Sequence, residues 1–152
     1  MNNILIATDG SELASKAVAE GIGLAKALGS HITILTVTAP LTSLGDQETA
    51  FASLPESVRR QALAYLAGDA ERTLSAALSA AKTAGVSADA MKSENHHPHD
   101  AIIAAAKSKG AELIVMASHG RSGMKAVLLG SVTQKVLTHS KLPVLVCRCA
   151  GR

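Results

Sequence analysis

The segment "AELIVMASHGRSGMKAVLLGSVTQKVLTH", residues 111–139, decides the fold. It opens on a nearly continuous apolar run, which is typical of a strand buried on both faces of a sheet. A turn with glycines at positions 120, 123 and 130 follows, and residues 131–139 have the pattern of a helix. A strand, a glycine-rich turn and a helix in this order indicate a unit of a parallel α/β sheet. They also raise the question of whether the turn binds a ligand.

The same alternation extends over the rest of the chain. Strands that alternate with helices predict a parallel sheet covered on both faces. We expect one doubly wound α/β domain over residues 1–152, with five parallel strands in the order 3-2-1-4-5 and the polar run at an edge. Apolar or β-branched runs predict the strands at 3–9, 31–38, 85–91, 111–118 and 143–149, and helical spacing predicts helices at 12–28, 58–82, 99–109 and 131–139.

Composition limits the classes of function. The chain has 152 residues, 47% of them apolar and 18% charged, which suits one domain with a substantial core. Its formal charge of +3 is dispersed, and one Phe, one Tyr and no Trp argue against single-strand nucleic-acid binding. Neither a signal peptide nor an apolar run long enough to cross a membrane is recognised, so we expect a cytoplasmic protein without a membrane partner.

In a doubly wound sheet, ligands bind at the carboxyl ends of strands where the winding direction reverses. Here those ends carry "TDGS" (8–11) and "ASHG" (117–120). The segment 39–55 follows the second predicted strand and has prolines near both its ends, so it is either a lid over this edge or a plain connection.

The helix after the glycine-rich turn offers a site for an anion. Ser131 and Gln134 have capping-box spacing, which predicts Ser131 as the N-cap. Main-chain N–H groups of 118–121 and 131–133 would then surround a phosphate chain, with Arg121 and Lys125 adding positive charge. An ordinary cap and turn without a ligand is the alternative.

The chain resembles the universal stress protein family over essentially its whole length. "ILIATDGSELASKAV" (4–18) resembles the family's first strand and turn, and residues 113–148 resemble its closing signature. ATP-binding members carry Gly-x2-Gly-x9-Gly-(Ser/Thr), which here falls on Ala117, Gly120, Gly130 and Ser131. Ala117 departs from the pattern. A strand-end residue normally keeps a negative φ, where alanine costs nothing, but its methyl group could crowd a ribose or phosphate.

The resemblance implies an adenine nucleotide site and a stress-response role as an ATP-binding module or sensor. It implies Asp9 toward the ribose, where a nucleotide-bound Mg²⁺ is also possible. Ala7 and, through its backbone, Val37 would lie beside the adenine, with Met116 against the base. The phosphates would lie among Ala117, His119, Gly120, Arg121, Ser122, Gly123, Gly130, Ser131, Val132 and Thr133. The family's terminal strand, here 143–149, pairs with its twin, so the resemblance implies a homodimer. A monomer whose sheet edge is protected by Lys141, Pro143 and Arg148 is the alternative.

Alternatives remain for the function and for single residues. The same site could hydrolyse ATP slowly or autophosphorylate the protein, or the chain could have lost nucleotide and act only through protein partners; direct DNA binding ranks last. Asp9 could be only a cap or turn residue, and His119 could merely occupy its turn. Gly21 and Gly23 more plausibly let the first helix approach the sheet than bind phosphate.

Two other groups could bind a metal, but a plain interpretation is favoured for both. His96, His97 and His99 have a spacing across Pro98 that does not direct three rings to one point, so a loop before a helix is favoured. Cys147 and Cys149 lack a second cysteine pair, so free thiols are expected.

Overall fold

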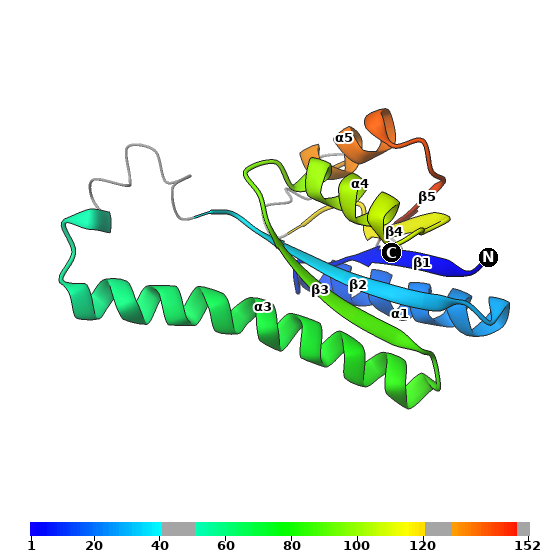
Figure 1. The fold of residues 1–152 in the computed structure, drawn as a ribbon, viewed down its shortest axis with the longest axis horizontal. Coiled ribbons are helices and arrows are strands. Elements are labelled where there is room, and N and C mark those ends of the chain that lie inside the picture. The colour runs from blue at the N-terminus through cyan, green and yellow to red at the C-terminus, as the bar shows by residue number, and fades with distance from the viewer. Residues whose placement is uncertain (41–50, 121–128, 149–152) are drawn as a thin grey trace.

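The computed structural model describes residues 1–40, 51–120 and 129–148. The strands form a parallel sheet in the order β3-β2-β1-β4-β5, so the predicted doubly wound fold is confirmed. Helices α1 and α3 cover one face of this sheet, and α4 and α5 cover the other (Figure 1). In chain order the elements are β1 (Asn3–Ala7), α1 (Glu12–Leu28), β2 (His31–Thr38), α3 (Glu56–Ala84), β3 (Ala88–Glu94), α4 (Pro98–Ser108), β4 (Leu113–Ala117), α5 (Ser131–His139) and β5 (Val144–Cys147).

The central strands are apolar at almost every position because both of their faces are covered. Along β1, Ile4 and Ile6 pack toward α1 and α3, whereas Leu5 packs toward α4 and α5. Strand β4 alternates in the same way, and every one of its residues is buried. Side chains of a strand point alternately to the two faces, so an unbroken apolar run is what two covered faces require.

Helix α1 is held close to the sheet and is defined at both ends. The Ser11 hydroxyl accepts a hydrogen bond of 3.2 Å from the Ala14 N–H at the start of the helix, and Gly29 ends it with φ of 63°. A Cβ on Gly21 would lie 2.6 Å from Ile6 Cδ1, whereas one on Gly23 would meet nothing within 4 Å. The prediction that glycine permits close approach is therefore confirmed for Gly21 and wrong for Gly23.

Element boundaries differ from the prediction mainly around β3. The run 85–91 was expected to be the strand, but Gly85 has φ of 75° and ends α3, so β3 begins at Ala88. Helix α3 is longer than the predicted 58–82, and its buried residues begin only at Ala70. Its N-terminal half extends beyond the sheet (Figure 1). Most of the predicted lid or loop, 39–55, lies outside the described residues.

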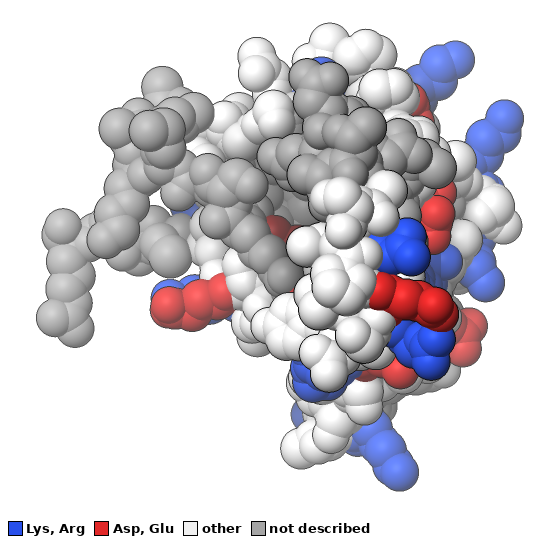
Figure 2. Space-filling model, turned by 90° about the vertical axis from the view of Figure 1, so that its left-hand side faces the viewer, with Lys and Arg blue, Asp and Glu red and all other residues white. Residues whose placement is uncertain are grey.

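Charge is mixed on the face that is turned toward the viewer in Figure 2. Lysine and arginine side chains there alternate with aspartate and glutamate rather than gathering in one patch. Among the described helices, none combines the length and apolarity that a bilayer span requires.

Candidate functional site

A pocket of about 420 Å³ lies at the carboxyl ends of β1, β2 and β4, and this volume is typical of small-molecule sites. It is located where the order of the sheet reverses, because β1 lies between β2 and β4. The described residues predicted to contact the nucleotide line this pocket, except Ser118: they are Ala7, Asp9, Val37, Met116, Ala117, His119, Gly120, Gly130, Ser131, Val132 and Thr133. The prediction for the Ser118 N–H is wrong, because Ser118 is buried and its N–H donates to the Cys147 carbonyl over 2.8 Å. The predicted residues Arg121, Ser122 and Gly123 lie outside the described part of the chain.

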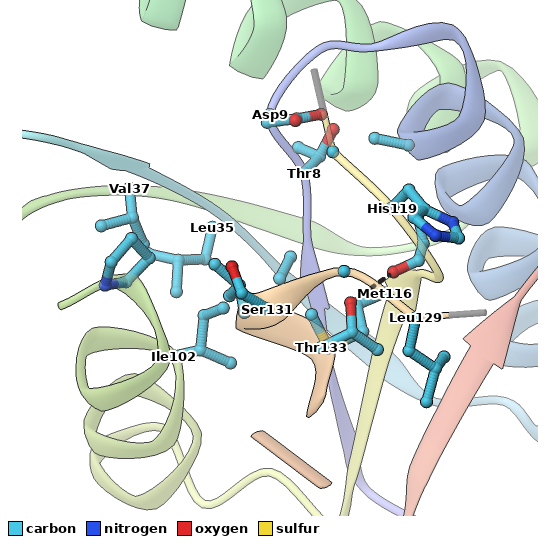
Figure 3. A pocket seen from close by; sticks show the side chains of 17 residues that line it. Thr8, Asp9, Leu35, Val37, Ile102, Met116, His119, Leu129, Ser131 and Thr133 are labelled. Atoms are coloured by element: carbon cyan, nitrogen blue, oxygen red, sulfur yellow. Dashed lines mark hydrogen bonds between the residues drawn. The ribbon is translucent and has the colours of Figure 1, made fainter. Parts of the chain in front are cut away.

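One end of the pocket is apolar. Leu35, Ile102 and Met116 belong to the cluster between the sheet and α4 and α5, and Val37 packs against that cluster (Figure 3). Sequence reasoning missed the wall that α4 contributes, formed by Pro98 and Ile102. The signal was available, because a helix that follows a strand of a parallel sheet begins at the carboxyl edge, and Pro98 marks the first turn of this helix.

The main chain of Val37 is directed toward the β1 side of β2 at this apolar end. The paired register of β1 and β2 ends at Ala7 and Leu35, and the Thr8 N–H then donates to the Leu35 carbonyl over 2.9 Å. Successive residues of a parallel strand direct their main-chain groups to opposite neighbours. The N–H and C=O of Val37 therefore point to the same side as those of Leu35, beyond the last paired residue of β1.

Asp9 lies in the turn that follows β1. Its Oδ1 accepts a 3.0 Å hydrogen bond from the Ser11 N–H, and the Thr8 hydroxyl accepts one of 3.3 Å from the Gly10 N–H. Ser11 is the N-cap of α1. Of the two predicted roles for Asp9 without a ligand, the role of turn residue is therefore correct and the role of helix cap is wrong. A Cβ on Gly120 would lie 2.5 Å from Asp9 Oδ2, so the absence of a side chain there lets the carboxylate approach the end of β4.

The N-terminus of α5 forms another wall. The predicted capping box is wrong, because Gly130 is the N-cap and Ser131 is already the first helical residue. Within the described chain no side chain caps this helix, whose Ser131, Val132 and Thr133 line the pocket. The first main-chain N–H groups of a helix lack intrahelical partners and carry the positive end of its dipole. This wall is therefore suited to an anion.

Ala117, the departure from the family pattern, keeps a negative φ, as do all described residues other than glycine. Its methyl group packs with Ala14 and Ala17 of α1. Met116 belongs to the cluster on the opposite face of the sheet, together with the residues of the apolar end. Ala117 therefore directs its side chain away from the apolar end and toward the small residues of α1.

His119 follows the end of β4, and one of its two ring nitrogens has a hydrogen-bond partner. Nδ1 is 3.1 Å from the Ser118 hydroxyl, and Nε2 is buried without a hydrogen-bond partner in the described residues. The ring lines the pocket, in agreement with its predicted location.

The other histidines do not form a metal centre in the described part of the chain. His97 is the N-cap of α4 and Pro98 its first residue, which agrees with the plain interpretation of this motif. The rings of His97 and His99 have centroids 5.9 Å apart, and those of His99 and His139 are 5.7 Å apart.

Cys147 on β5 is a free thiol, as predicted. Burial, and to a smaller degree the Glu20 carboxylate, raise the pKa of Cys147 above its ordinary value. Cys149 lies outside the described residues.

The sheet order and this pocket define the class of doubly wound α/β domains whose ligand site lies at the carboxyl edge. Residues 1–148 match the model of the universal stress protein family. The chain is 33% identical to universal stress protein YxiE of Bacillus subtilis over 147 residues, which is 97% of this chain and 99% of that protein. The chain therefore belongs to the universal stress protein family.

Solved structures of the family share this fold. Protein MJ0577 of Methanocaldococcus jannaschii has a TM-score of 0.78 and 26% identity, with 99% of this chain and 98% of that chain covered. A universal stress protein in complex with cAMP has a TM-score of 0.69 and 24% identity, with 98% of each chain covered.

Proposed function

We propose that this protein is a cytoplasmic, dimeric stress-response module that binds an adenine nucleotide, with ATP as the first candidate. The observation that carries this proposal is that residues from three strand ends and from the N-terminal turns of α4 and α5 line a single pocket. The family relative in complex with cAMP lends further support.

The walls of the pocket suit the parts of a nucleotide. Leu35, Ile102 and Met116 offer apolar surface for a base, and the Val37 main chain offers a donor and an acceptor for its edge. The Asp9 carboxylate is suited to accept hydrogen bonds from ribose hydroxyls. The uncapped N-terminus of α5 and its Ser131 hydroxyl are suited to phosphate.

Neither Ala117 nor a magnesium requirement opposes ATP. The Ala117 methyl group packs on α1 and leaves the apolar end free. Asp9 is the described carboxylate of the pocket, so it is the side chain that would share a nucleotide-bound Mg²⁺ with the phosphates. The metal would supply positive charge against the phosphate chain.

We also propose that the dimer forms through the terminal strand, 143–149. Strand β5 is at an edge of the sheet, and Leu145 is 40% exposed there. An apolar edge strand is a surface that another strand covers readily.

Titration calorimetry with ATP and Mg²⁺ tests the nucleotide proposal. With one Tyr and no Trp, the chain absorbs weakly at 280 nm, so copurified adenine nucleotide is expected to dominate the ultraviolet spectrum near 260 nm. A protein that carries no nucleotide and gives no heat with millimolar ATP would contradict the proposal. It would favour a family member that acts through protein partners alone.

Asp9→Asn separates ligand binding from the turn. Its amide oxygen still accepts the Ser11 N–H, so the turn is retained while the charge on the ribose side is lost. We expect ATP to bind about tenfold more weakly, as for the loss of one charge-assisted hydrogen bond. Asp89→Asn, which makes the same change on an exposed residue of β3, is the control and is expected to leave affinity unchanged.

A further inference from the structure

We propose that Thr133 is a positioning residue that makes the pocket selective for phosphate-bearing ligands, by covering a strand-end carbonyl and fixing the N-terminus of α5. This inference rests on the nucleotide proposal and deepens it.

Thr133 connects α5 to the end of β4. Its side-chain hydroxyl donates a buried hydrogen bond of 2.9 Å to the carbonyl of Ala117, the last residue of β4 (Figure 3). Thr133 is only 3% exposed, although it is in the first turn of a helix that borders the pocket. The hydroxyl hydrogen of Thr133 is therefore already donated to the Ala117 carbonyl, so this side chain does not donate to a ligand.

The carbonyls at the carboxyl edge present a problem for any anion site. A carbonyl at a strand end lacks a ladder partner once the neighbouring strand has ended, and an uncovered oxygen there places the negative end of a dipole near a phosphate. A buried acceptor without a partner also carries a desolvation penalty. By donating to the Ala117 carbonyl, the Thr133 hydroxyl gives this acceptor a partner and covers its negative end against a phosphate.

Neighbouring strand-end carbonyls are covered in the same manner. The Thr36 hydroxyl donates 2.9 Å to the Thr8 carbonyl at the end of β1, and Thr36 is also buried. The Gly130 N–H donates 2.7 Å to the Ser118 carbonyl. Covered acceptors at these strand ends and uncapped N–H groups at the start of α5 make this wall of the pocket rich in donors, which favours anions there.

The bond also orients the helix. Thr133 occupies the third helical position, from which a side chain commonly returns to its own N-cap. Here it reaches across to β4 instead, so the first turn of α5 is tied to the strand that carries Ala117. Its N–H groups thereby keep one direction before any ligand arrives, which lowers the entropy lost on binding.

Thr133→Val tests this role because valine keeps the branched shape and loses the hydroxyl. The measured quantity is the ratio of ATP to adenosine affinity by calorimetry, since adenosine lacks phosphates. We expect the ratio to fall about tenfold for Thr133→Val. Thr133→Ser retains the donor and is expected to keep the native ratio.

Thr138→Val is the matched control on the same helix. The Thr138 hydroxyl also donates to a main-chain carbonyl, that of Gln134 over 2.8 Å, but it is exposed and outside the pocket. The ratio of ATP to adenosine affinity of Thr138→Val is expected to equal that of the native protein. Should Thr133→Val not fold, Thr133→Cys, with its weaker donor, is expected to lower the ratio about threefold.

A native ratio in a folded Thr133→Val or Thr133→Cys, or an equal fall in Thr138→Val, would overturn the role of Thr133 alone. A native protein that binds no ATP would overturn the nucleotide proposal and this inference with it, so the two failures are distinguishable.

Discussion

Replacing Ala117 with glycine restores the family's ATP-binding pattern, and we expect it to weaken the fold without strengthening ATP binding. The methyl group of Ala117 is buried with Ala14 and Ala17 of α1. Its φ is negative, so glycine relieves no backbone strain at this position. The substitution therefore removes the packing of residue 117 against α1 and adds no contact with ATP.

The magnitude follows from two contributions. One buried methyl group is worth about 0.8 kcal/mol, to which the space left between α1 and β4 adds. Glycine within a strand costs about 0.5–1 kcal/mol more than alanine. We expect a loss of about 2 kcal/mol of unfolding free energy, which lowers Tm by about 4–8 °C for a chain of this size.

Far-ultraviolet circular dichroism is the suitable assay for stability, since the chain has no tryptophan and one tyrosine. Ala90→Gly, at an exposed position of strand β3, is the control and should show only the backbone cost of about 0.5–1 kcal/mol. ATP affinity of Ala117→Gly should remain within about twofold of native. An affinity at least tenfold higher would mean that the methyl group intrudes on the ligand, and would refute the reasoning.

Further predictions concern α1 and β5. Gly21→Ala is expected to destabilise the protein by about 1 kcal/mol or more in chemical denaturation, because its Cβ would meet the fully buried Ile6 side chain. Gly23→Ala is expected to stabilise it by about 0.5–1 kcal/mol, because the added methyl group meets nothing and alanine favours the helix; equal effects at both sites would contradict the packing argument. In a Cys149→Ser background at pH 8, Cys147 should react with iodoacetamide more slowly than a peptide thiol, because its raised pKa leaves less thiolate. The rate should rise as pH increases toward that pKa and should reach the peptide rate in urea, whereas a peptide-like rate in the native protein would contradict the shift.

The order of the sheet was predictable because its central strands are apolar at consecutive positions. Such runs occur where both faces are covered, and β1 and β4 are indeed buried on both faces. The location of the pocket followed from the same reasoning, since the ends of adjacent parallel strands meet at one edge. Residues 8–11 and 117–120, far apart in sequence, are brought together in this way.

Local details were less predictable because they depend on neighbours across the fold. Gly21 and Gly23 look equivalent in sequence, yet one faces Ile6 and the other faces open space. Ser131 has capping-box spacing to Gln134, but the turn places Gly130 at the N-cap. The wall formed by Pro98 and Ile102 is different, because a helix that follows a parallel strand begins at the carboxyl edge and this contribution was therefore predictable.

The first position of the family motif is best understood as one partner in a packing contact. Ala117 ends β4 with its side chain toward α1, where residues 14 and 17 are both alanine. Small residues on the helix make room for a methyl group on the strand, so alanine and glycine can both occupy the position without a change in φ. Gly120 and Gly130 differ, because a Cβ would lie 2.5 Å from Asp9 Oδ2 at the former and 3.3 Å from the Ser118 carbonyl oxygen at the latter. The two positions that keep glycine are thus those where the added atom would meet polar groups at the strand ends, and position 117 is the one where it packs with apolar side chains of α1 and β5.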